Sequence, residues 1–249
     1  MTNANFIAKI VPIRGIIVSG IPLPEQLLGR VTLSENIVKS IEDLEKEEKV
    51  KAIIFEINSS GGMPYPVKEI ADAIKKCQKI TVAQIREYGI SGAYWVASAC
   101  KKIVADPLSQ IGGIGVRAER FDFSGLLEKI GIKIHQFTTG KYKGIGSPYA
   151  EMTEEEREYI QGLIDTINQH FIQEIKESRG IKDEAVLEKI VSGRPYLGQE
   201  AKELGLIDEL GDREEARKIA SDLTGMELKI EEYIEKGFKL PMIFRFFKP

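Results

Sequence analysis

The sequence alternates short runs of β-branched and apolar residues with longer amphipathic segments, and this alternation is its strongest constraint on the fold. Residues 51–57 are typical of a buried strand, and residues 66–77 carry apolar side chains at helical spacing. Residues 80–85 and 91–97 repeat the same order. Repeated β-then-α units predict an α/β fold with a mainly parallel sheet covered by helices.

The other predicted elements extend this pattern toward a helical C-terminal arm. We expect an opening strand or hairpin over 6–19, a helix over 32–48 capped by Ser34, strands at 102–105 and 133–137, and a helix near 124–130. Residues 153–156 have the form of a capping box and predict a long helix that reaches about residue 179. Shorter helices are predicted at 183–190, 199–204 and 212–223.

No internal repeat or low-complexity linker divides the chain, so we predict a single domain over residues 1–249. Its core is expected at about 6–150, its helical C-terminal region at about 151–225 and an apolar tail at about 238–249.

Composition excludes several classes of function. A net charge of −3 gives no general attraction to nucleic acid. With two cysteines, two histidines and no Cys-x-x-Cys pattern, no metal site is expected. No apolar run approaches the roughly 20 residues needed to cross a bilayer, and the first six residues do not resemble a signal peptide. We therefore expect a cytoplasmic or membrane-associated protein with no transmembrane segment in this chain.

Ser91 is the first candidate catalytic residue. It lies between Gly89 and Gly92, where a predicted strand passes into a predicted helix. The start of a helix offers unpaired backbone amides and a partial positive charge, which suit a serine that becomes an alkoxide during reaction. Serine is also a common helix N-cap, and by itself Ser91 is better explained in that way.

Two glycine-rich segments are candidates to complete a site. Residues 58–62 (Asn-Ser-Ser-Gly-Gly) directly follow a predicted strand, where backbone amides can form an oxyanion hole, although an ordinary turn has the same composition. Residues 138–148 contain Lys141 and Lys143 but lack the phosphate-binding pattern Gly-x-x-x-x-Gly-Lys-Ser/Thr. Solvated loop lysines are the default explanation of this second segment.

A catalytic serine needs a base, and histidine is poorly placed to supply one. His135 lies in a predicted strand and His170 inside the long predicted helix, which are structural or surface positions. A lysine remains, and it must be neutral, so burial has to lower its pKa by a few units from about 10.4. Cys100 is a weaker nucleophile candidate because it is predicted to be a buried helix residue.

Taken together, these segments resemble the signal peptide peptidase A (SppA) family of serine peptidases, which share the Clp protease/crotonase fold. Residues 58–62 are similar to the family's Asn-Ser-Pro-Gly-Gly loop, and residues 91–95 (Ser-Gly-Ala-Tyr-Trp) to its nucleophile motif. Residues 140–143 are similar to its lysine motif, and residues 193–201 and 205–211 to its C-terminal signature. The order of the motifs, with Lys143 located 52 positions after Ser91, makes the set specific.

The resemblance implies a Ser–Lys dyad, with Ser91 as nucleophile, Lys143 as base and Lys141 as a surface neighbour. It implies an oxyanion hole of glycine amides: Gly61, Gly62 and Gly92. It also implies an acyl-enzyme mechanism without a cofactor, peptide substrates such as cleaved signal peptides and other short or unfolded segments, and a ring- or dome-shaped homo-oligomer.

The chain departs from the family pattern at three positions. Ser60 replaces a proline and Ala93 a glycine, and both substitutes are small. Gly113 replaces a serine that the family uses to hold the catalytic lysine. A backbone carbonyl, a water molecule or another hydroxyl must then orient Lys143, and the candidate hydroxyls belong to Ser147, Ser109 and Thr139. With Gly113 in place of the serine, we expect slower turnover or loss of activity.

Two alternative functions stay open within this fold. A crotonase-like acyl-CoA enzyme would use the same oxyanion loops on a thioester without needing Ser91 or Lys143. A catalytically weak scaffold protein is made plausible by Gly113. The basic, aromatic segment 238–248 fits either contact with a membrane surface or packing on a neighbouring subunit, and the packing role is favoured.

Overall fold

The computed structural model describes residues 6–20 and 30–234, and the chain divides into two compact units. The first unit comprises the residues up to Ile114 and those from Ile175 onward, and the second comprises Gly115–Glu174. The single domain and its internal boundaries stay a prediction. The apolar tail predicted at about 238–249 lies outside the described residues.

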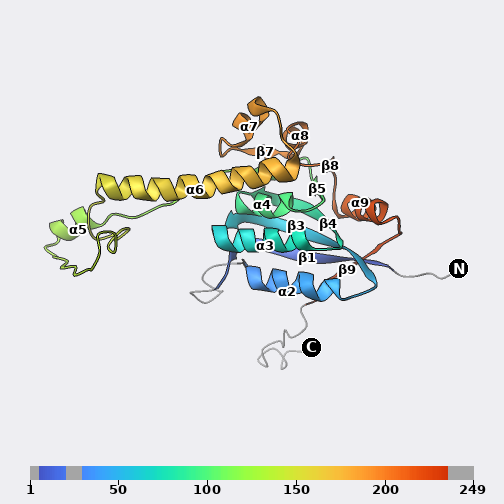
Figure 1. Cartoon of the computed structure of the whole chain (residues 1–249), viewed down its shortest axis with the longest axis horizontal. Helices are drawn as coiled ribbons and strands as arrows, with labels where there is room; N and C mark the ends of the chain where they lie inside the picture. Colours follow the sequence, from blue (N-terminus) through green and yellow to red (C-terminus); the bar gives the residue numbers. More distant parts are fainter. Residues whose placement is uncertain (1–5, 21–29, 235–249) are drawn as a thin grey trace, which may run out of the picture. The chain divides into compact units, whose positions relative to one another are not determined.

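A largely parallel sheet forms the centre of the first unit, which confirms the predicted α/β class (Figure 1). Its main strands follow the order β2-β1-β3-β4-β5-β8. Their bounds are β1 Ile7–Val18, β2 Val31–Leu33, β3 Val50–Gly62, β4 Ile80–Ile90, β5 Lys102–Ala105 and β8 Glu209–Leu210. Three short strands join this path: β6 (Gln110–Gly112) beside β4, β7 (Pro195–Leu197) antiparallel to β6, and β9 (Lys229–Glu232) parallel to β1.

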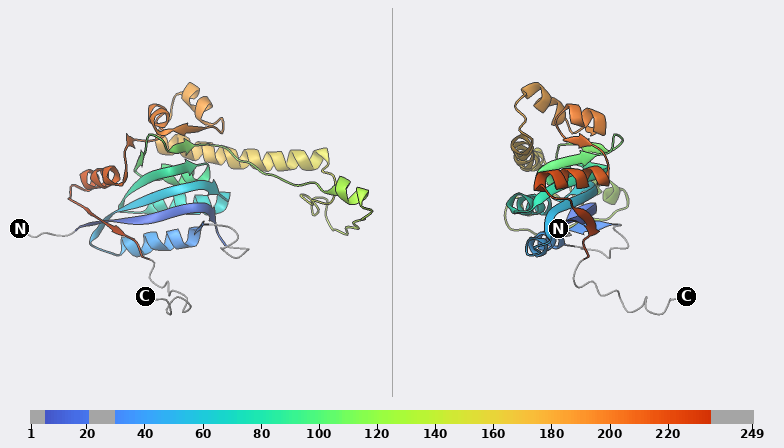
Figure 2. Two further views of the ribbon diagram at one scale, coloured as in Figure 1. Left: turned by 180° about the vertical axis from the view of Figure 1, so that it is seen from behind. Right: turned by 90° about the vertical axis from the view of Figure 1, so that its right-hand side faces the viewer.

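Helices cover both faces of this sheet (Figure 2). Three pack along one face, namely α2 (Ser34–Glu45), α3 (Pro64–Lys76) and α4 (Gly92–Ser98), and α9 (Arg213–Thr224) covers one end of the other face. Ile54 belongs to the core cluster under α9, with Ala216 and Ala220, while its neighbours Ile53 and Phe55 face the opposite side and are also fully buried. Burial on both faces explains why residues 52–55 in the middle of β3 are all apolar.

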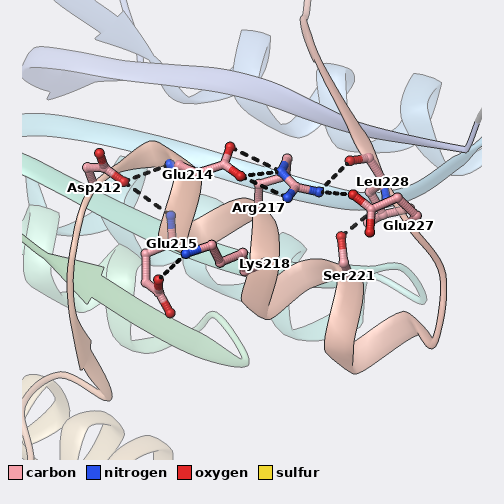
Figure 3. Close-up of polar contacts among 8 residues, drawn as sticks. All are labelled: Asp212, Glu214, Glu215, Arg217, Lys218, Ser221, Glu227 and Leu228. Carbon is pink, nitrogen blue, oxygen red and sulfur yellow. Dashed lines mark hydrogen bonds and ion pairs between the residues drawn. The ribbon is translucent and has the colours of Figure 1, made fainter.

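The α9 helix is held at both ends by polar contacts (Figure 3). The Asp212 carboxylate caps its first turn by accepting from two backbone amides, at 2.9 and 3.2 Å. Arg217 donates to the Glu227 carboxylate and to the Leu228 carbonyl, and the Ser221 hydroxyl accepts from the Leu228 amide. These contacts set the turn through which the chain passes from α9 into β9.

The second unit contains α5 (Ser124–Lys129) and most of α6 (Glu154–Arg179). The predicted capping box at the start of α6 is confirmed: the Glu156 amide donates to the Thr153 hydroxyl at 3.2 Å, and the Thr153 amide to the Glu156 carboxylate at 2.9 Å. The helices predicted at 66–77, 183–190, 199–204 and 212–223 are also confirmed. They correspond, in this order, to α3, α7 (Glu184–Ile190), α8 (Gly198–Glu203) and α9.

Three local predictions were wrong. Residues 132–138 are irregular rather than strand, because a strand needs a neighbour to satisfy its backbone, and this segment pairs with no other described strand. Ser34 is not the cap of α2: Leu33 occupies that position. The segment predicted to be an opening strand or hairpin is a strand, β1, which pairs in parallel with β3. Strands β3 and β4 continue past their predicted ends at residues 57 and 85 and end at Gly62 and Ile90.

A buried carboxylate ties these layers together. Glu56, in β3, is 3% exposed and accepts hydrogen bonds from Arg14 in β1 and, at 2.6 Å, from Arg213 at the start of α9. Arg86, in β4, lies 3.8 Å from the same carboxylate. Burial alone would raise the pKa of Glu56, but the hydrogen bond from Arg213 and the charges of Arg213, Arg14 and Arg86 outweigh it, so the net pKa is lowered.

We predict that Glu56→Gln destabilises the fold by about 2–4 kcal/mol at neutral pH, because the arginines lose their shared carboxylate. Since the folded-state pKa of Glu56 is lowered, its contribution is present above the unfolded-state pKa of about 4.3 and is lost as the pH falls further. The difference between variant and parent in urea unfolding should therefore shrink below about pH 4. Glu188→Gln, at an exposed position of α7, is the control. A Glu56→Gln effect as small as the control's would contradict the prediction.

Candidate active site

Ser91 sits at the turn from β4 into α4 in a conformation that serine rarely adopts. Its φ is 53° and its ψ −127°, and it is the only non-glycine residue with positive φ in the described part of the chain. Its amide donates to the Gly112 carbonyl at 2.7 Å, and its carbonyl accepts from the Tyr94 amide at 2.9 Å. Strained backbone of this kind costs about 1–3 kcal/mol and is typical of functional sites.

The side chain of Ser91 does not act as a helix cap. The residue occupies the N-cap position of α4, but its hydroxyl accepts no capping hydrogen bond. A capping serine has extended φ and ψ and uses its oxygen on the first helical turn. The simplest structural explanation of Ser91 therefore does not describe this residue.

The end of β3 lies against this turn, and glycines make the close approach possible. A Cβ on Gly61, whose φ is +103°, would lie 2.8 Å from the Gly92 nitrogen and 3.0 Å from the Ser91 Cβ. A Cβ on Gly62 would lie 2.0 Å from the Ile17 carbonyl oxygen in β1. A Cβ on Gly92 would lie 2.5 Å from a Val67 methyl carbon and 3.4 Å from the Gly62 nitrogen. A larger residue at Gly61 would push β3 away from Ser91, whereas one at Gly62 would clash with β1 and one at Gly92 would clash with Val67.

The three glycine amides differ in their availability to a substrate. The Gly61 amide donates to the Ser59 hydroxyl at 3.0 Å. The amide of Met63 donates to the Ile17 carbonyl in β1, so the intervening amide of Gly62 points to the other side of the strand. Gly92 begins α4, and the first amides of a helix have no partner inside it. The amides of Gly62 and Gly92 are therefore better placed than the Gly61 amide to donate to a substrate oxygen.

Ser59 supports this loop, a role that sequence reasoning missed. It is 2% exposed, and its hydroxyl donates to the Gly15 carbonyl at 2.6 Å while accepting from the Gly61 amide. One side chain thus ties the end of β3 to β1. The local composition was compatible with an ordinary turn, so nothing in the pattern distinguished Ser59 from Ser60.

Lys143 belongs to the second unit, in a run of turns over residues 141–146. Its amide donates to the Gly140 carbonyl at 3.2 Å, and its side chain is exposed. Lys141 is different, because it forms an ion pair with Glu155. The hydrogen bond to Glu155 and the charge of that carboxylate raise the pKa of Lys141, which keeps it protonated and unsuited to be a base.

The three hydroxyls proposed to orient the lysine lie in different places. Thr139 and Ser147 flank the same run of turns as Lys143, Thr139 exposed and Ser147 half-buried. The hydroxyl oxygen of Ser147 accepts a hydrogen bond from the Tyr149 amide at 3.4 Å. Ser109 is buried in the first unit, just before β6, and its hydroxyl donates to the Arg86 carbonyl.

The other candidate groups are unsuited to catalysis. His135 is exposed in the irregular segment, and His170 is exposed on α6. Cys100 is buried, and burial strongly raises the pKa of its thiol, which disfavours the reactive thiolate.

Comparisons with known proteins identify the family of this chain. The model of peptidase family S49 matches residues 73–227, a span that contains both Ser91 and Lys143. The chain belongs to peptidase family S49. The resemblance to SppA proteins is thereby confirmed.

Relatives of this S49 protein come from distant organisms. The chain is 36% identical over 204 residues to a candidate protease of Methanocaldococcus jannaschii, covering 81% of this chain and 65% of that protein. It is 30% identical over 204 residues to a candidate signal peptide peptidase SppA of Enterococcus faecium, covering 78% and 59%. It is 29% identical over 219 residues to the chloroplastic serine protease SPPA of Arabidopsis thaliana, covering 86% and 32%. The chain spans less than two thirds of the length of each of these relatives.

Gly113, the departure from the SppA pattern, lies next to Ser91 in this S49 structure. Its φ is +58°, and a Cβ there would lie 3.6 Å from the Ser91 nitrogen and 2.5 Å from a methyl carbon of Ile90. A serine in this backbone would therefore meet both a left-handed conformation and a side-chain clash.

We predict that Gly113→Ser lowers the stability of this S49 protein by about 1–2 kcal/mol, through the left-handed backbone and the contact with Ile90. Chemical denaturation measures the change. Gly162→Ser, on α6, has an open position without positive φ and should change stability by less than about 0.5 kcal/mol. Equal stability of the two variants would show that residue 113 accepts a serine without strain.

Proposed function

We propose that this S49 protein is a serine endopeptidase with Ser91 as nucleophile and Lys143 as general base. The observation that carries the proposal is the conformation of Ser91, which is held at positive φ beside the glycines of β3 with its hydroxyl unused as a cap. The helix-start position and the close glycine backbone both suit attack on a peptide carbonyl.

The proposed reaction has two halves that balance in protons. In the first, Ser91 Oγ bonds to the peptide carbonyl carbon while neutral Lys143 takes the serine proton. The C–N bond then breaks, the leaving amine takes that proton, and an acyl-enzyme ester remains. In the second, Lys143 removes a proton from water, whose oxygen attacks the ester and releases the acid as Ser91 regains its proton. The steps need neither metal nor nucleotide.

The negative oxygen that develops in each half requires hydrogen-bond donors. The amides of Gly62 and Gly92 supply them in this proposal, and Gly61 lets β3 approach closely while its own amide stays with Ser59. Removing one oxyanion donor from a serine protease costs roughly 100- to 1,000-fold in kcat, so the backbone contact that places these amides makes a large contribution of its own to the proposed rate.

The proposed substrates are peptides in extended conformation with small or apolar side chains, because the reacting carbonyl has to come within hydrogen-bond distance of the backbone amides of Gly62 and Gly92. Cleaved signal peptides fit this description, in line with the name of the Enterococcus faecium relative. No helix in the described ranges is long and apolar enough to cross a membrane. We place the protein in the cytoplasm or at a membrane surface as part of the same proposal.

We further propose a homo-oligomer that assembles through the second unit. Many large apolar side chains of this unit are exposed, and they are Phe121, Phe123, Leu126, Ile130, Ile132, Ile134 and Phe137. No residue of α5 is buried. Exposed apolar side chains in this number are typical of contact surfaces.

We predict that Ser91→Ala and Lys143→Ala each abolish hydrolysis of a short chromogenic peptide while leaving thermal unfolding unchanged. Because only neutral lysine accepts a proton, kcat of the parent should rise with pH along an alkaline limb, and any residual activity of Lys143→Ala should lack that limb. A fluorophosphonate probe should label Ser91 covalently, and Ser91→Ala serves as the control for labelling.

Other outcomes point to the alternatives. Full peptidase activity in either variant would rule out the dyad. Thioester turnover that survives both substitutions would favour an acyl-CoA enzyme. A parent protein that forms no acyl-enzyme with any substrate or probe would favour a scaffold.

We predict that Phe137→Asp lowers the assembly mass measured by light scattering, because Phe137 is 93% exposed within the apolar set of the second unit. Leu108→Asp is the matched control, since Leu108 is 78% exposed in the first unit. A monomeric parent, or equal masses for the two variants, would contradict assembly through this surface.

A further inference from the structure

The two residues that precede Lys143 make specific contacts with the start of α6. The Tyr142 ring stacks on the Tyr159 ring, with centroids 5.1 Å apart and planes inclined by 18°. The Tyr142 hydroxyl donates to the Glu155 carboxylate at 2.7 Å, and Lys141 pairs with the same carboxylate. Two consecutive residues of the lysine loop are therefore held by one helix.

That part of α6 is itself well fixed. The capping box of Thr153 and Glu156 determines where the helix begins and places Glu155 in its first turn. A carboxylate in the first turn of a helix is also favoured by the helix dipole. Tyr159 lies four positions after Glu155, so the two groups that contact Tyr142 share one face of the helix.

The far end of the loop has a second attachment. The Arg120 guanidinium donates to the carbonyls of Ser147 and Ala150, its Nε lying 3.0 Å from the Ser147 oxygen. The amide of Phe123 donates to the Pro148 carbonyl at 2.8 Å. Lys143 thus lies between two anchored segments, while its own side chain stays exposed.

We propose that Tyr142 is a positioning residue for Lys143, which holds the lysine loop against α6 through Tyr159 and Glu155. The inference rests on the proposed function, in which Lys143 is the base. It gives this chain a device for orienting the loop backbone that does not require a side chain at position 113.

The contact between Tyr142 and Glu155 is suited to the alkaline pH at which a lysine base is neutral. The hydrogen bond to Glu155 raises the pKa of Tyr142, so its phenol stays a donor as the pH rises. Hydrogen bonds from Lys141 and Tyr142 lower the pKa of Glu155, so it stays an acceptor. The attachment therefore persists at the alkaline pH that favours a neutral lysine.

The test compares Tyr142→Phe, which keeps the ring stack, with Tyr142→Ala, which loses both contacts. We expect Tyr142→Ala to lower kcat about 10- to 100-fold with little change in KM, because a small displacement of the base is costly. Tyr142→Phe should lose about fivefold, the equivalent of one hydrogen bond. Tyr65→Ala is the matched control, because Tyr65 on α3 is also exposed and hydrogen-bonded to a glutamate, Glu69.

Hydrogen exchange gives a readout that does not depend on activity. The loop amides of Lys143, Ile145 and Ser147 donate to loop carbonyls, and they should exchange faster in Tyr142→Ala but not in Tyr65→Ala. Unchanged kcat and unchanged loop exchange in Tyr142→Ala would overturn the proposal. Faster exchange throughout the second unit would also overturn it, by showing a general structural role. Activity retained in Lys143→Ala would instead remove the dyad and leave the exchange result for Tyr142 standing.

Discussion

The candidate site depends on one close backbone contact, between the end of β3 and the turn from β4 into α4. Gly61 approaches both Ser91 and Gly92, and Gly62 is pressed against β1 on its other side. This backbone contact leaves no room for side chains on Gly61 or Gly62. The strained Ser91 and the amides of Gly62 and Gly92 are therefore held together. Neither element would hold this geometry alone, because each is fixed by the backbone of the other.

The sheet supplies the rigidity that such a contact needs. Ser59 ties the end of β3 to β1 through the Gly15 carbonyl, and the Gly112 carbonyl at the end of β6 accepts from the Ser91 amide. Further from the site, Glu56 joins β1, β3 and α9 through its arginine partners. A strained residue persists only where its surroundings over-determine it, and the hydrogen bonds of Ser59 and of the Gly112 carbonyl are part of what fixes Ser91.

Sequence reasoning predicted the elements whose signal is local. The helical periodicity of residues 66–77 and the capping box at Thr153 depend only on residues close in the sequence, and both predictions were confirmed. The segment 133–137 was wrongly predicted because β-branched composition cannot show whether a partner strand exists. The ends of β3 and β4 were predicted too short because glycines that usually mark turns here permit close packing between strands. The positive φ of Ser91 could not be predicted, since it follows from contacts with residues far away in the sequence.

In the proposed dyad, Lys143 poses a different physical problem from Ser91. Ser91 is fixed by backbone contacts that leave no alternative, whereas Lys143 is an exposed side chain whose loop is held at its flanks. A hydroxyl at position 113 would act on one atom of the lysine, but Gly113 has a backbone that disfavours any such side chain. Anchoring the loop through Tyr142 restricts the lysine backbone and leaves the side chain free to rotate. In such a site, the entropy of the lysine side chain, rather than the nucleophile, would limit how often the dyad assembles.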